Sequence, residues 1–111
     1  MKFYNRHGAA VAYLEGETIY SWNGSPLAYL HGDNVFSYEG NHLGWLQDGW
    51  IVDHDGGNSY FTDHAVGGPM KPLKQLESLK GLKDLLPLKS LRELSPLKPF
   101  RSMGWGSDIF G

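Results

Sequence analysis

The segment YSWNGSPLAYLHGDNV, residues 20–35, decides the fold of this chain, because its pattern occurs four times without a gap. The four copies are 16 residues long and together cover residues 4–67. Each copy has glycine at its fifth position and an aromatic residue at its tenth. Periodicity of this kind is typical of repeat folds, in which a terminal copy often drifts, as the second half of the fourth does here. The repeated residues are Gly8, Gly24, Gly40 and Gly56, and then Tyr13, Tyr29, Trp45 and Phe61.

The 20–35 copy has the pattern of a β-hairpin. Its apolar residues alternate with period two, and Gly, Asn and Asp break the runs. Asn23-Gly24 predicts a two-residue type I′ turn, which needs positive φ at both central residues. Residues 31–34 turn the chain a second time. The predicted cross-strand pairs are Trp22–Ser25, Tyr20–Leu27, Ile19–Ala28, Leu30–Val35 and Tyr29–Phe36.

Four such hairpins give an all-β fold, a pseudo-fourfold meander of eight short strands with two apolar faces. An antiparallel sheet with one side in water has only one apolar face. We therefore expect the hairpins to close on themselves around the small-residue face, and a second layer to cover the aromatic face. The small-residue face holds Ala12, Leu14, Ile19, Ala28, Leu30, Val35, Gly44, Leu46 and Ile51. The aromatic face holds Tyr4, Val11, Tyr13, Tyr20, Trp22, Leu27, Tyr29, Phe36, Tyr38, Leu43, Trp45, Val52 and Phe61.

A C-terminal tail rich in Leu, Lys and Pro follows, with an apolar residue at every third position from Met70 to Met103. A period of three fits neither an α-helix nor a strand but matches polyproline II, so we expect little regular structure. Pro87 and Pro96 interrupt any long helix, although a short helix near 75–86 is compatible with the sequence. At about 3.1 Å per residue the stretch would be on the order of 100 Å long, so it must wrap, bend or reach another subunit.

The sequence thus divides into a four-hairpin domain, residues 1–67, and a tail, residues 68–111. We expect the apolar stripe of the tail to dock on the aromatic face of its own hairpins or of a neighbouring subunit. The alternative is a low-complexity linker. Charge is compatible with docking: residues 1–66 carry two basic and eight acidic side chains, whereas residues 67–111 carry eight basic and four acidic ones. Both regions could equally present solvated faces.

Composition excludes several classes of function. The chain has no cysteine, which removes disulfides, thiolate zinc sites and thiol catalysis. No apolar run approaches the roughly 18 residues of a membrane span, and MKFYNRHG (1–8) lacks the apolar stretch of a signal peptide. We therefore expect a cytoplasmic protein with no membrane partner.

Several segments carry a family resemblance. SPLAYL (25–30), HLGWL (42–46) and DHDG (53–56), with GGP (67–69) leading into a PLK-rich tail, resemble the 4-fold β-flower proteins. The resemblance covers nearly the whole chain. It implies a pseudo-fourfold arrangement of hairpins, and it implies no activity and no functional residues.

No catalytic, metal or cofactor motif stands out, and we do not expect an enzyme. The densest polar cluster is Asp53-His54-Asp55 with Asp63-His64, but His54 points away from its two neighbours in a strand, which argues against a metal site. Lysines diluted among leucines and acids are a weak signature of nucleic-acid binding. The remaining candidates for ligand binding share the third repeat position: Arg6, Trp22, Tyr38 and His54.

Two functional hypotheses remain. The first is a non-enzymatic assembly or protein-interaction module that forms homo-oligomers or docks its own tail. The second is a small-ligand domain that stacks a carbohydrate or nucleotide on a ring formed by the third-position residues. Burial of Trp22 and Tyr38 under the tail would count against the second.

Overall fold

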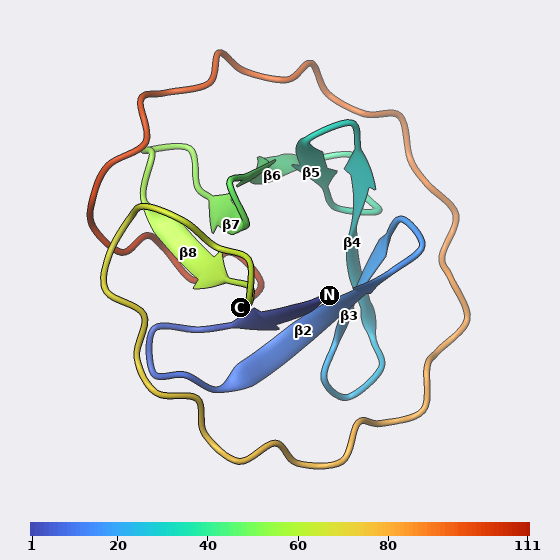
Figure 1. Cartoon of the computed structure of the whole chain (residues 1–111). Helices are drawn as coiled ribbons and strands as arrows, with labels where there is room; N and C mark the ends of the chain where they lie inside the picture. Colours follow the sequence, from blue (N-terminus) through green and yellow to red (C-terminus); the bar gives the residue numbers. More distant parts are fainter.

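Eight antiparallel strands follow one another around a closed barrel in the computed structural model, which describes residues 1–111 (Figure 1). The molecule is a flat disc with extents of 37 × 37 × 20 Å. The all-β prediction is confirmed, and the closed barrel consists of the predicted hairpins. The strands are β1 (Lys2–Tyr4), β2 (Ala10–Glu15), β3 (Thr18–Ser21), β4 (Pro26–His31), β5 (Asn34–Phe36), β6 (His42–Gln47), β7 (Trp50–Val52) and β8 (Asn58–Phe61).

Two-residue turns join β2 to β3, β4 to β5 and β6 to β7. The predicted pairs Leu30–Val35 and Tyr29–Phe36 are both present across β4 and β5. In the β6–β7 turn, Asp48 has a φ of 52° and Gly49 a φ of 81°, the two positive values of a type I′ turn.

The turn at Asn23-Gly24 differs from the prediction. The Gly24 amide donates to the carbonyl of Ser21 over 2.9 Å, so the turn spans four residues, 21–24. Only Gly24 has positive φ, at 96°. The Ser21 hydroxyl accepts a hydrogen bond from the Ser25 amide at 3.0 Å, which favours this wider turn over the two-residue one.

The wider turn shifts the register of β3 on β4. Ile19 pairs with Ala28 as predicted, but Tyr20 pairs with Pro26 rather than with Leu27. The shift turns Leu27 away from the aromatic face and against the barrel core, and Val11 and Leu43 of two other copies pack there too. Their predicted assignment to the aromatic face is therefore wrong.

Small and aliphatic residues, together with Phe3 and Tyr60, fill the interior of the barrel, because an eight-stranded barrel is only wide enough for its own side chains. Tyr60 stands at the repeat position that Ala12, Ala28 and Gly44 occupy in the first three copies, and it packs in the same cluster as Ala12 and Ala28. The buried core consists of Phe3, Ala12, Ile19, Ala28, Val35, Ile51 and Tyr60.

The tail circles the barrel as an irregular belt (Figure 1). It contains no helix, so the short helix considered near 75–86 is wrong. Amides that a helix would pair internally donate instead to the barrel, as that of Gly81 does to the carbonyl of Trp22 at 2.9 Å. No helix suited to crossing a membrane is present.

Candidate functional site

The belt is attached to the barrel at four equivalent points. The amides of four tail residues, nine positions apart, donate to the carbonyls of the four repeat glycines, sixteen positions apart, over 2.7–2.9 Å. Nine residues of tail therefore match each 16-residue copy of the hairpin. The donor and acceptor pairs are Gln75–Gly8, Asp84–Gly24, Glu93–Gly40 and Ser102–Gly56.

Sequence analysis missed this nine-residue repeat, because the stronger three-residue spacing concealed it. The signal is nevertheless present in the tail, where KPLKQ, KGLKD, KSLRE and KPFRS recur at 71–75, 80–84, 89–93 and 98–102.

The repeat glycines leave room for the belt. A Cβ atom on Gly24 would collide with the carbonyl oxygen of Leu82, and the same holds for Gly8 beneath Leu73. By contrast, a Cβ atom on Gly32, in one of the two-residue turns, would meet no neighbouring atom within 4 Å. Glycine at the attachment points thus permits both the positive φ and the close approach of a second backbone.

Basic residues form the inner face of the belt. The Lys80 ammonium lies 4.5 Å from the ring centroid of Tyr13, and the Lys89 ammonium lies 4.4 Å from that of Tyr29. Lys89 also pairs with the Glu17 carboxylate at 2.6 Å, which lowers the pKa of Glu17 and raises that of Lys89. Cation–π contacts and ion pairs therefore cover the aromatic face.

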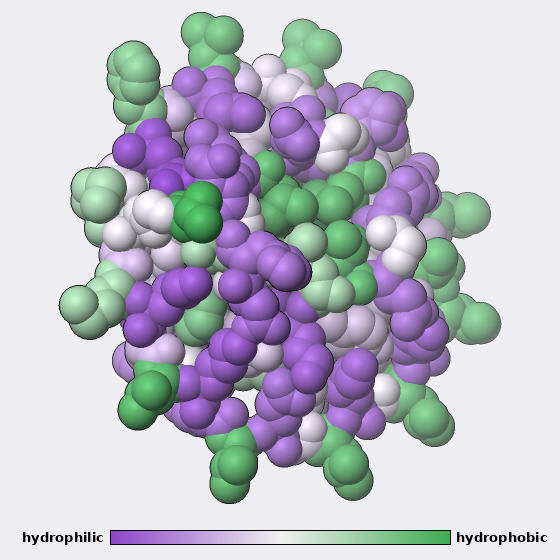
Figure 2. All heavy atoms as spheres, in the orientation of Figure 1, coloured by the Kyte–Doolittle hydropathy of each residue, from purple (hydrophilic) through white to green (hydrophobic).

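The apolar stripe of the tail faces solvent and does not contact the aromatic face of its own hairpins, whereas docking on a neighbouring subunit stays a prediction. The aliphatic stems and charged heads of lysines cover that face instead, so each triplet directs its apolar residue outward. Hydrophobic side chains stand out around the edge of the disc in Figure 2. We call this set the leucine rim. Its eleven side chains are 92–101% exposed: Met70, Leu73, Leu76, Leu79, Leu82, Leu85, Leu88, Leu91, Leu94, Leu97 and Phe100.

The end of the tail returns to the barrel. The Trp105 ring lies 5.6 Å from that of Trp50, and the Phe110 ring stacks on Tyr60 at 4.8 Å. The Tyr60 hydroxyl donates to the carboxylate of Asp108. Burial, together with this carboxylate, raises the pKa of Tyr60. The belt is thus anchored by aromatic packing at its end.

The four candidate ligand residues do not form an open ring. Each occupies the second position of a repeat turn, but two are covered: Trp22 is 8% exposed and Tyr38 is 4% exposed. The Trp22 indole donates to the Ser78 carbonyl of the belt at 2.9 Å, while the Tyr38 hydroxyl bonds with that of Thr18. This covering argues against a sugar or base stacked on the ring.

His54, the fourth candidate, pairs with a histidine that sequence analysis did not single out. Its Nε2 lies 2.9 Å from Nδ1 of the buried His42. Nε2 of His42 donates to the Asn34 side-chain oxygen, so His42 Nδ1 accepts the proton of His54. Burial, and then the charge of His54, lower the pKa of His42. No group of three or more His, Cys, Asp or Glu side chains is arranged to hold a metal ion.

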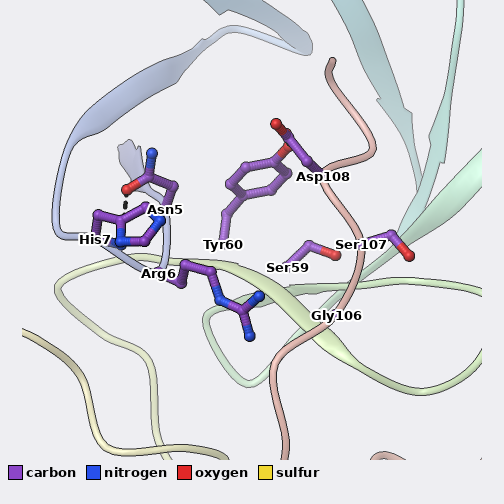
Figure 3. Close-up of a pocket in the computed structure, with 8 residues that line it drawn as sticks. All are labelled: Asn5, Arg6, His7, Ser59, Tyr60, Gly106, Ser107 and Asp108. Atoms are coloured by element: carbon purple, nitrogen blue, oxygen red, sulfur yellow. Dashed lines mark hydrogen bonds between the residues drawn. The ribbon is translucent and has the colours of Figure 1, made fainter.

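Arg6, the first candidate, borders a polar pocket of about 140 Å³ (Figure 3). The first repeat turn forms one wall, β8 forms the floor and the end of the tail forms the other wall. The lining residues are Asn5, Arg6, His7, Ser59, Tyr60, Gly106, Ser107 and Asp108.

The fold and its attached belt define a class: a closed barrel of four hairpin repeats encircled by its own C-terminal segment. A family model described as "4-fold beta flower protein" matches residues 1–110. The chain belongs to the 4-fold beta flower family. Searches of the curated proteins and of the solved structures found no match. The family description names an architecture and no activity.

Proposed function

We propose that the chain is a non-enzymatic assembly module whose leucine rim joins copies of the chain edge to edge. The observation that supports this is the complete exposure of eleven apolar side chains around the disc. Single exposed apolar residues are common on protein surfaces, but a regular series of eleven along one edge favours an interaction surface. Each leucine that a partner buries contributes about 1.5–3 kcal/mol.

The shape of the rim favours a planar assembly over a closed dimer. Successive rim residues are three positions apart, about 9 Å in a polyproline-like chain. Two convex edges meet through only a few such side chains. The area that they bury is therefore less than the roughly 1,600 Å² of a standard interface. Pairwise contacts are therefore weak, whereas a disc surrounded by several copies buries most of its rim.

The ion-paired charges of the belt face the barrel rather than the rim. On the inner face of the belt, lysines form ion pairs with acidic residues of the barrel, as in Lys83–Glu15 and Lys89–Glu17. Those cations are thus already paired, so the rim relies on apolar contact rather than on attraction to an anionic partner. A cytoplasmic location stays part of the proposal, and the absence of cysteine suits such a reducing compartment.

Sedimentation velocity over a concentration series tests the proposal. The intact chain should form species above its monomer mass of 12.4 kDa as the concentration rises. Replacing Leu76, Leu85 and Leu94 together with Gln should return it to monomer without loss of stability, because these side chains are fully exposed.

Lys98→Gln is the matched control, since Lys98 is exposed and forms none of the five ion pairs. It should assemble as the unmodified chain does. A chain that remains monomeric at millimolar concentration, or a triple variant that assembles equally well, would refute the proposal.

A further inference from the structure

The pocket beside Arg6 lies between segments that are distant in sequence. In Figure 3, Arg6 extends from the first repeat turn toward the end of the pocket where Ser59 of β8 lies, and Asp108 lies at the opposite end beside the Tyr60 ring. At about 140 Å³ the pocket is smaller than the roughly 300–1,000 Å³ of sites for drug-sized ligands. An occupant must therefore be a small molecule.

Arg6 supplies a cation without an anionic partner. It forms none of the five ion pairs of the chain, whereas Arg101 pairs with Asp48. Its guanidinium carbon lies 5.8 Å from the centroid of the Trp105 ring, a contact that holds the group without using its N–H donors. A guanidinium presents those donors as a planar fork that matches a carboxylate.

Ser59 is the second, independent indication of a ligand. Its side chain lines the pocket, the residue is only 5% exposed, and its buried hydroxyl has no hydrogen-bond partner. Buried hydroxyl groups are nearly always paired, so an orphan at the floor of a pocket needs an explanation. The hydroxyl oxygen is itself buried, so the Ser59 side chain must turn into the pocket for a ligand oxygen to provide the missing acceptor.

We propose that this pocket binds a small monocarboxylate. Arg6 donates two N–H groups to the carboxylate, and the Ser59 hydroxyl donates a third hydrogen bond. Asp108 repels any anion, but a dianion such as phosphate more strongly than a monocarboxylate, because like charges in one small pocket repel. The Asp108 carboxylate can also accept a hydrogen bond from a donor at the other end of the ligand.

Titration of the ¹⁵N-labelled full chain with sodium acetate, followed by two-dimensional NMR, tests the proposal. Sodium chloride at equal ionic strength controls for screening, and sodium phosphate probes the preference for a monoanion. Acetate should shift the Arg6 Nε–H and Ser59 amide signals in a saturable way, chloride should not, and phosphate should bind more weakly.

Two variants and one control separate the site from general cation effects. Arg6→Gln should abolish the acetate response, and Ser59→Ala should weaken binding about tenfold, as the loss of a hydrogen bond to a charged group implies. Arg92→Gln should leave binding unchanged, since Arg92 lies over Phe36 at 5.7 Å, much as Arg6 lies over Trp105. The proposal is overturned if acetate shifts the signals no more than chloride does, or if the response to acetate persists in Arg6→Gln. It is also overturned if Ser59→Ala binds acetate as tightly as the unmodified chain, or if phosphate binds more tightly than acetate.

Discussion

The inner and outer faces of the belt contrast in a way that reverses the usual placement of residues. Lysines lie inward, over aromatic rings and beside acids, whereas the side chains of the leucine rim lie outward in solvent. The inner face is stabilised by cation–π contacts, ion pairs and backbone hydrogen bonds, each modest in energy. The difference shows that a repeated apolar residue can mark the surface of an attached segment, while the residue beside it makes the attachment.

The largest effect is expected at the attachment points. Gly24→Ala should destabilise the fold by about 3 kcal/mol, because Ala is strained at positive φ and its Cβ would displace the carbonyl of Leu82. Gly32→Ala shares the positive φ without the collision and should lose only about 1 kcal/mol. Urea denaturation measures both, and equal losses would show that the belt does not depend on the glycine.

A second comparison sets one lysine against its neighbouring leucine. Lys80→Ala should lower the free energy of unfolding by about 1 kcal/mol, because Lys80 lies over Tyr13 and Trp22. Leu79→Ala should change it by less than about 0.5 kcal/mol in dilute monomer, since the side chain is exposed. The same denaturation assay compares them, and a larger loss for Leu79 would reverse our assignment of the two faces.

The pH dependence of stability tests the contact between the barrel and the third nine-residue segment of the belt, where the His42 amide donates to the Glu93 side chain. Burial lowers the pKa of His42 in the folded state below its ordinary value of about 6.5, so protons bind preferentially to the unfolded chain. Stability should therefore be full above that value and fall as the pH drops through it towards the lower folded pKa. Thermal unfolding between pH 8 and 5 measures this, and His42→Gln should flatten the profile in that window.

The smallest effect is expected from salt. The ion pairs of the inner face are exposed, so raising NaCl from 0.05 to 0.5 M should lower the melting temperature only slightly. Rim association, which is apolar, should persist or strengthen over the same range. Parallel melting and sedimentation experiments compare the two, and salt-dissociated assemblies would indicate that charge, rather than leucine, joins the discs.

Sequence patterns predicted the barrel better than they predicted the belt. Alternation in β4 and β5 determined the register at Leu30–Val35, because one buried face constrains every side chain of a strand. The Ser21 hydroxyl altered the neighbouring turn, a side-chain effect that the Asn23-Gly24 pair does not reveal.

The orientation of the belt could not be derived from hydrophobicity, since apolar residues are expected inside and lysines outside. Arg6 was included as a candidate for its repeat position, but Ser59 acquires interest only when the end of the tail closes the pocket. Pockets built from distant segments are invisible to motif analysis.

The pairing of sixteen barrel residues with nine belt residues restricts how such a chain can grow. A fifth repeat would need a new 16-residue hairpin in the part of the gene that encodes the barrel and a new nine-residue segment in the part that encodes the tail. A single tandem duplication supplies one of these without the other. It leaves either a hairpin without a belt segment over it or a belt segment without a hairpin to bind. Changes of symmetry in this architecture thus require two coordinated insertions. This requirement favours retention of four hairpin repeats while the individual side chains change.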